Sequence, residues 1–154
     1  MREPSKYLQG LYTPKNPKKY DGDPTKVVYR SSWELRLFNW CDSSPNVVRW
    51  SSEEVIVPYI CPTDGKAHRY FVDAKVVILG KDGKERTYLV EVKPEKETAA
   101  PKERKRKTKG YWGEVMTWGK NQAKWTAADE YAKRRGWQFK LITERELGLK
   151  KGTK

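Results

Sequence analysis

Asp73, Glu91 and Lys93 are the residues whose types and spacing point most directly to chemistry. Two carboxylates brought face to face repel each other, and burying them without a partner is costly. A divalent cation removes both problems, and carboxylate oxygens suit Mg²⁺, which also binds substrate phosphate. A lysine beside such a pair can orient or deprotonate a water molecule or stabilise charge on a phosphorus centre. The alternative is an ordinary cross-strand ion pair between Lys93 and one of the acids.

The elements that must position these residues are two β-rich runs, 69–79 and 84–93, joined by a short loop that contains Asp82 and Gly83. This pattern predicts a β-hairpin. A three-residue loop over 81–83, a type I turn with Gly83 in the left-handed conformation, sets Asp73 opposite Glu91 and Phe71 opposite Lys93. A two-residue loop shifts the register by one and separates the two carboxylates.

Alternation along the strands places Asp73, Glu91 and Lys93 on one face of the predicted hairpin. The opposite face is almost entirely apolar, and we expect it to be core. Its members are Tyr70, Val72, Ala74, Val76, Ile78, Tyr88, Val90 and Val92.

A helix over 31–42 contributes a third candidate acid, Glu34. Ser31 and Ser32 are good N-caps, and the helical spacing is carried by Trp33, Leu37, Phe38, Trp40 and Cys41. Ser31 and Glu34 also form a capping box, in which Glu34 accepts a hydrogen bond from the Ser31 backbone N–H. Because Glu34 aligns with Leu37 and Phe38, it points towards the sheet as well.

A second helix over 111–135 ends at Gly136, which is typical of a C-cap. Its predicted inward stripe is Val115, Trp118, Gln122, Trp125, Ala128 and Ala132. Gln122 is either a buried amide bonded to backbone or a residue that orients Lys93 or a phosphate. Lys120 and Lys124, on another flank, are candidates for phosphate contacts.

The remaining segments are strands, loops and tails. We expect an extended run over 47–50 and strands over 54–60 and 137–143. The domain is expected over 27–147, with a basic tail over 148–154. An extended basic arm over 1–26 either packs over the domain or contacts DNA or a partner protein. The charge-dense segment 95–110 is either a solvated mobile loop or a clamp on the DNA backbone. Its candidate DNA contacts are Lys102, Arg104, Lys105, Arg106, Lys107 and Lys109.

Charge is the outlying property of the composition. The 154 residues carry 33 Lys and Arg against 20 Asp and Glu, a formal net charge of +13, which favours a polyanionic partner such as nucleic acid. No run is long and apolar enough to span a bilayer, and no secretory signal is expected. With only Cys41, Cys61 and His68, neither a disulfide scaffold nor a zinc site is expected, and a reducing compartment fits best. His68 is either structural or a base or phosphate contact.

The order of elements, with an acid on the first helix and Asp73…Glu91-x-Lys93 on consecutive strands, resembles the PD-(D/E)xK nuclease superfamily. The resemblance implies a mixed α+β fold with a restriction-endonuclease-like αβββαβ core, a central mixed sheet flanked by helices. One departure is Val72, which stands where the motif's name has proline.

Several segments resemble more closely the head completion proteins of T-even-type tailed phages: 29–34, 50–53, 58–59, 68–73, 91–94 and 121–125. The same constellation is similar to the transposase endonuclease subunit TnsA. The resemblance implies a Mg²⁺-dependent deoxyribonuclease in which Mn²⁺ can substitute. Its metal ligands would be Asp73, Glu91, the Val92 carbonyl and Glu34, with Lys93 and Gln122 completing the catalytic set.

The same resemblance implies action on double-stranded DNA after genome packaging, when the filled head is prepared for the tail. Portal and neck proteins of the head are the implied partners, and the host cytoplasm or the virion is the implied location. Two alternatives stay open: a non-catalytic structural neck protein that binds DNA, and a transposition or repair endonuclease of the TnsA type.

Overall fold

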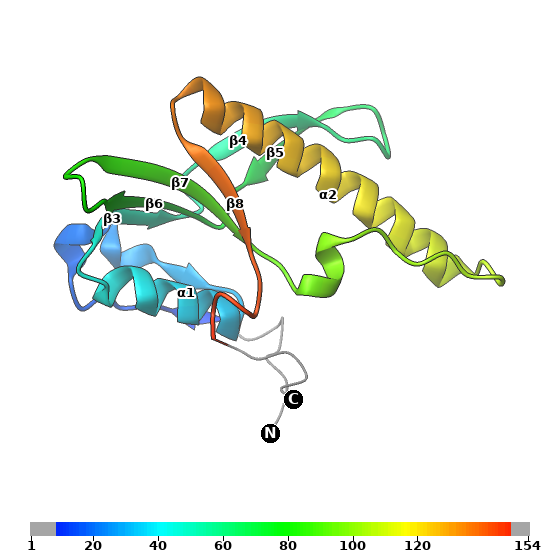
Figure 1. Ribbon diagram of the computed structural model, residues 1–154. Coiled ribbons are helices and arrows are strands. Elements are labelled where there is room, and N and C mark those ends of the chain that lie inside the picture. Colours follow the sequence, from blue (N-terminus) through cyan, green and yellow to red (C-terminus); the bar gives the residue numbers. More distant parts are fainter. Residues whose placement is uncertain (1–8, 149–154) are drawn as a thin grey trace.

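A four-stranded mixed sheet forms the centre of the protein in the computed structural model, which describes residues 9–148 (Figure 1). The strand order is β3-β6-β7-β8, and the strands are β3 (Val47–Ser52), β6 (Ala74–Leu79), β7 (Glu85–Val92) and β8 (Gln138–Ile142). Helix α1 (Ser32–Ser43) covers one face and helix α2 (Lys109–Arg134) covers the other. This arrangement confirms the expected mixed α+β class.

Parallel and antiparallel pairing follow from the connections. Strands β3, β6 and β7 pair antiparallel, whereas β8 runs parallel to β7. A parallel neighbour needs a crossover, and α2 supplies it. The expected order of helix, three sheet strands, helix and strand is therefore present, with β3 as the first strand of the sheet. No helix in the described part of the chain is long and apolar enough to cross a membrane.

The loop between β6 and β7 has the predicted three residues. The Gly80 N–H donates to the Lys84 carbonyl (2.8 Å), and the Gly83 N–H donates to the Gly80 carbonyl (3.0 Å). Gly83 has a φ of +81°, the left-handed conformation that glycine adopts without steric cost. The resulting register pairs Ala74 with Val90, so the next pair towards the open end is Asp73 with Glu91.

The predicted strand over 69–79 is wrong in one respect, because it is two strands. Strand β5 (Ala67–Phe71) pairs with β4 (Ile56–Ile60) as a separate two-stranded sheet, and β6 starts only at Ala74. Phe71 consequently pairs with Ile56 and does not lie opposite Lys93. The chain changes partners at 72–73, where it leaves β4 and joins the central sheet.

This break also resets the alternation of side chains. Tyr70 and Val72 pack in the core beneath α2, together with Leu89. Ala74 and Val90 pack in the other core, beneath α1. Five members of the predicted apolar face are buried, and Ile78, Tyr88 and Val92 are half-buried against the core. The first two members, Tyr70 and Val72, lie on the opposite side of the sheet from the rest.

Helix α1 begins as the capping pattern predicts, with one change of partner. The Ser31 Oγ atom accepts a hydrogen bond from the Glu34 N–H (3.1 Å). Glu34 Oε1 accepts from the Arg30 N–H (3.0 Å), however, and not from the Ser31 N–H as the capping box requires. Leu37 and Phe38 are buried against the sheet, which confirms the predicted inward face.

Helix α2 starts two residues earlier than predicted, so Lys109 belongs to the helix and not to the preceding loop. Thr108 is the cause, since its hydroxyl accepts a hydrogen bond from the Tyr111 N–H (3.1 Å) as an N-cap. The buried residues of the helix are Tyr111, Asn121, Trp125, Ala128 and Ala132. Val115 and Gln122, both predicted to face inward, are only half-buried.

The described part of the N-terminal arm, residues 9–26, packs over the domain. Strand β1 (Gly10–Leu11) pairs with β2 (Val28–Tyr29), and short 3₁₀ turns lie at Pro17–Lys19 and Pro24–Lys26. Asp42 is buried and accepts hydrogen bonds from the Tyr12 hydroxyl (2.8 Å) and the Lys15 N–H (2.7 Å). The first eight residues of the predicted arm and residues 149–154 of the predicted tail lie outside the described residues.

Candidate active site

Asp73 and Glu91 meet at the open end of the β6–β7 hairpin. The Val92 N–H donates to Asp73 Oδ2 (2.9 Å), and the Asp73 N–H points at Glu91 Oε1 (3.4 Å). Each carboxylate thus accepts from the backbone of the neighbouring strand. The prediction that the hairpin loop sets these two acids opposite each other is confirmed.

The two carboxyl groups share an environment that disfavours negative charge. Burial raises the pKa of Asp73 well above its ordinary value, and the charges of Glu91 and Glu34 raise it further. Burial also raises the pKa of Glu91, which is only 7% exposed. Hydrogen bonds to these groups oppose the shift but do not cancel it. The positive charges of Lys93 and Lys124 also oppose the shift of the Glu91 pKa, and burial still outweighs them.

Tyr70 and Lys124 complete the surroundings of Glu91, and the sequence pattern identified neither as a partner of that acid. The buried Tyr70 hydroxyl donates to Glu91 Oε1 (2.6 Å). Lys124 Nζ lies 5.5 Å from the centre of the Tyr70 ring. Burial lowers the pKa of Lys124, and the Glu91 charge opposes that effect. Lys124 was predicted as a phosphate contact on a separate flank, yet it lies beside the acids.

Glu34 approaches the same acids from the start of α1. Burial raises the pKa of Glu34, and the nearby charges of Glu53 and Glu91 also raise it. Arg30 forms a two-pronged ion pair with Glu53, with Nε and Nη2 lying 2.9 Å and 3.1 Å from the two carboxylate oxygens. The Glu53 N–H donates to the Asp73 carbonyl (3.3 Å), which ties this pair to the site.

Glu53 has an unusual backbone conformation, with a φ of +55°. The left-handed region costs a residue with a Cβ on the order of 1–3 kcal/mol, and such residues concentrate at functional sites. Glu53 lies within the 50–53 segment of the phage-like resemblance, which was the one sequence signal that could have identified it.

The three acids do not form a closed cage of direct ligands. Within residues 9–148, Glu34, Asp73 and Glu91 do not bring three carboxylate oxygens within 4.8 Å of one another. The two predicted modes for Glu34, direct or water-mediated, stay predictions.

Lys93 lies beside the acids as predicted. Its Nζ atom is 3.8 Å from Glu91 Oε2, and the side chain is 27% exposed. The Lys93 N–H donates to the Ile142 carbonyl (3.0 Å), which fixes the backbone between β7 and β8. The ion pair between Lys93 and one of the acids, which was the alternative to a catalytic role, is therefore present. The same ammonium group lies next to any ligand that Glu91 Oε2 would bind.

Two predicted site residues, Gln122 and His68, form no hydrogen bond or ion pair with the acids within residues 9–148. Gln122 is half-buried and has no side-chain hydrogen bond to another described residue, so its role stays a prediction. His68 lies in β5, where its Nε2 atom is 2.8 Å from Asp64 Oδ2.

The six candidate DNA contacts between Lys102 and Lys109 divide into two groups. Arg104 contacts Glu114 (3.1 Å), and Lys107 contacts Glu103 (3.0 Å); both cations also lie over the Tyr111 ring. The other four are exposed and form no recorded ion pair within the described residues: Lys102, Lys105, Arg106 and Lys109. Figure 1 shows this loop at the end of α2 that projects beyond the sheet.

A groove of about 1190 Å³ lies between this loop and the first half of α2. The short turn η3 (Glu95–Thr98), which follows the site directly in the chain, forms part of its wall. Lys102, Arg104, Trp118 and the buried Asn121 also line it.

The residues at the site fit a divalent cation. Asp73 Oδ2 and Glu91 Oε1 are occupied by hydrogen bonds, whereas Asp73 Oδ1 accepts none from the described residues and Glu91 Oε2 faces only Lys93. Two hard oxygen atoms from facing carboxylates match the ligand preference of Mg²⁺ and Mn²⁺. The Val92 carbonyl lies between Glu91 and Lys93 in the chain and is a candidate third ligand.

Comparison with known proteins agrees with this geometry. Residues 44–144, which contain Asp73, Glu91 and Lys93, match the family described as TnsA-like endonuclease N terminal. The head completion nuclease of Enterobacteria phage T4 is 41% identical over 148 residues, covering 92% of this chain and 96% of that protein. No solved structure matches the chain. The chain therefore belongs to the TnsA-like endonuclease family and is a homologue of the T4 head completion nuclease.

Proposed function

We propose that this protein is a Mg²⁺-dependent DNA endonuclease that hydrolyses phosphodiester bonds, with Mn²⁺ as a competent substitute. The observation that carries the proposal is the pair of facing carboxylates at the open end of the β6–β7 hairpin, whose pKa values burial raises, with Lys93 Nζ 3.8 Å from Glu91 Oε2. Membership of an endonuclease family supports the same reaction.

Asp73, Glu91 and the Val92 carbonyl would bind the cation directly, and Glu34 would bind it through water. When bound, the cation supplies Lewis-acid polarisation of the phosphate and makes a water molecule a stronger nucleophile. The Tyr70 hydroxyl fixes one oxygen of Glu91 by its 2.6 Å hydrogen bond, which leaves the other oxygen as the ligand. Such support of a ligand typically contributes 10–100-fold to affinity or activity, roughly.

Lys93 would orient the attacking water molecule as an ammonium group, or deprotonate it as the neutral amine, because its Nζ atom lies beside the same acids. Lys124, held over the Tyr70 ring, would stabilise the negative charge that develops on the phosphate. We retain Gln122 in a supporting role on α2, where it would contact a phosphate or Lys93 once DNA is bound.

DNA would be held by phosphate contacts from the basic loop and from α2. The candidate residues are Lys102, Arg104, Lys105, Arg106, Lys107, Lys109 and Lys120. Arg104 and Lys107 can exchange their carboxylate partners for phosphates at little cost, because exposed ion pairs contribute only about 0–1 kcal/mol. Duplex DNA suits the charge of +13.

We further propose that the protein acts in phage head completion, on double-stranded DNA of the packaged genome and together with portal or neck proteins of the head. This would place it in the host cytoplasm during assembly or on the virion. The T4 relative is described as a head completion nuclease, and its alignment with this chain covers nearly the full length of both proteins.

Nicking of supercoiled plasmid by the purified chain tests the reaction. We expect cleavage with Mg²⁺ or Mn²⁺, none with excess chelator, and recovery when Mg²⁺ is restored. Plasmid binding without cleavage under all these conditions would instead support a structural neck protein that binds DNA. Strand cleavage that required a transposon end would favour a role like that of TnsA, whose family this chain shares.

A further inference from the structure

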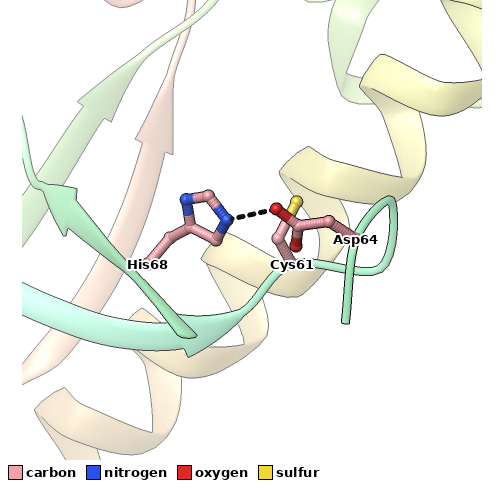
Figure 2. Close-up of side chains that lie close together, drawn as sticks. All are labelled: Cys61, Asp64 and His68. Atoms are coloured by element: carbon pink, nitrogen blue, oxygen red, sulfur yellow. Dashed lines mark hydrogen bonds and ion pairs between the residues drawn. The ribbon is translucent and has the colours of Figure 1, made fainter. Parts of the chain in front are cut away.

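A second group of metal-ligating side chains lies in the turn between β4 and β5. Figure 2 shows Cys61, which follows β4, beside Asp64 of the turn and His68 of β5. The Gly65 N–H donates to the Cys61 carbonyl (2.8 Å), and the Cys61 N–H donates to the Lys66 carbonyl (2.9 Å). These bonds fold the turn back on itself and bring the three side chains together.

Their ligand atoms already lie at distances close to those of a metal centre. The Cys61 Sγ atom, a carboxylate oxygen of Asp64 and a ring nitrogen of His68 are all within 4.8 Å of one another, and His68 Nε2 is 2.8 Å from Asp64 Oδ2. Bonds of about 2.0–2.3 Å in tetrahedral geometry place such atoms about 3–4 Å apart. Small side-chain rotations would suffice to receive an ion.

The donor set selects a borderline-soft cation. A thiolate, an imidazole and a carboxylate suit Zn²⁺, whereas Mg²⁺ prefers oxygen ligands alone. Sequence counting argued against zinc because the chain has few Cys and His, but the turn adds Asp64 as a third ligand.

The three side chains differ in burial, with one in the core and two facing solvent. Cys61 is 1% exposed and packs in the core beneath α2, whereas the Asp64 and His68 side chains are 40% and 41% exposed. An ion could therefore enter from solvent and be held against the core side. The Tyr59 ring lies 5.9 Å from the His68 ring and restricts its movement on one side.

We propose that Cys61, Asp64 and His68 form a Zn²⁺ site, separate from the acids at Asp73 and Glu91, with water as the fourth ligand. Zinc there would close the tip of the β4–β5 sheet. Val57 and Cys61, in and next to that sheet, pack in one core cluster with Trp125 of α2. Zinc would therefore also stabilise the position of α2, which carries Lys120 and Lys124.

Titration of the full chain with Co²⁺, in excess Mg²⁺ to occupy the other site, tests this proposal. We expect one Co²⁺ per chain with visible absorption of a tetrahedral site and a thiolate charge-transfer band, both lost when Zn²⁺ is added. Cys61→Ser should remove the thiolate band. His68→Asn and Asp64→Asn, both at exposed positions, should weaken binding at least about 10-fold. Zn²⁺ should raise the Tm of the parent but not that of His68→Asn.

Two control variants separate this site from other carboxylates. Asp82→Asn changes an exposed acid in the β6–β7 turn, and Asp73→Asn changes the candidate active site; both should bind Co²⁺ like the parent. Absence of thiolate absorption, or equal binding by the parent, Cys61→Ser and His68→Asn, would overturn the proposal. In that case Asp64 and His68 form a surface ion pair and Cys61 is a core residue.

Discussion

Each acid of the candidate site is held in surroundings that disfavour its charged form. Asp73 receives one backbone hydrogen bond, which does not offset burial and the nearby charges of Glu91 and Glu34. Proteins keep such groups where a ligand supplies the missing charge. The metal-free protein is therefore less stable, near neutral pH, than the same fold without this repulsion.

The pH dependence of stability provides a first prediction. The raised pKa of Asp73 means that the folded state keeps a proton that the unfolded chain has already lost. The contribution of Asp73 to the free energy of unfolding thus falls as pH rises from the ordinary carboxyl pKa of about 4 to the raised value. Asp73→Asn removes this dependence.

Thermal unfolding in chelator, at about pH 4.5 and at about pH 7.5, measures the effect. We expect Asp73→Asn to gain stability relative to the parent at the higher pH. Adding Mg²⁺ at that pH should raise the Tm of the parent and leave the variant unchanged. A parent that gained stability over Asp73→Asn on going to the higher pH in chelator would contradict this explanation.

Lys124 provides a second prediction at this scale. Lys124→Met keeps the apolar contact with Tyr70 but removes the charge near Glu91, and should lower the cleavage rate at saturating DNA about 10–100-fold. Lys120→Met, one turn away, is the matched control and should mainly weaken binding. If the two variants lowered the cleavage rate equally, Lys124 would have no specific role in the active site.

The facing positions of Asp73 and Glu91 could be predicted from sequence because a short loop fixes the register between two strands. Tyr70 and Lys124 could not, because the contact of Tyr70 depends on the change of strand partner at 72–73, and that of Lys124 depends on the rotation of α2. Neither is visible in residue patterns. Glu34 was identified from helical spacing, but its bond to the Arg30 N–H required the geometry of the helix start.

At the scale of elements, the β6–β7 loop determines whether the site exists. A shift of one residue would turn Glu91 to the other face of the sheet. Gly83 at φ +81° is what permits the three-residue loop, and a Cβ there would meet no atom within 4 Å. The cost of a substitution is therefore one of backbone conformation alone.

Gly83→Ala should lower the free energy of unfolding by about 1–2 kcal/mol, the cost of the left-handed conformation. Gly113→Ala is the matched control, because it also adds a Cβ in open space but lies within α2. Gly113→Ala should raise the free energy of unfolding by up to about 1 kcal/mol. Denaturant unfolding measures both, and a neutral Gly83→Ala would show that the loop does not depend on this conformation.

The basic loop is the element proposed to hold the DNA backbone. Replacing Lys102, Lys105 and Arg106 by Ala should reduce the slope of log affinity against log salt by about 2–3 and leave protein stability unchanged. Lys26, Lys81 and Lys84 are exposed lysines elsewhere, and their triple Ala variant is the control. Fluorescence anisotropy with a duplex measures the slopes, and equal slopes would exclude the loop as a clamp.

At the scale of the whole molecule, the two helices pack on opposite faces of one sheet while the acids gather at one end of it. The sequence predicted the α+β class, both helices and the hairpin register, since each has a local pattern. It did not predict that β4 and β5 form their own sheet, because strand partners are chosen by packing on α2 and not by local pattern. The Cys61, Asp64 and His68 group follows from that same sheet.

Cleavage by acid variants that still fold tests the central claim most directly. In Mg²⁺, Asp73→Asn and Glu91→Gln should nick supercoiled plasmid at least about 1000-fold more slowly than the parent, a loss of about 4 kcal/mol in transition-state stabilisation. Both should keep the parent's circular dichroism spectrum and affinity for duplex DNA. Cleavage at the parent's rate by either folded variant would contradict the assignment of these acids as metal ligands.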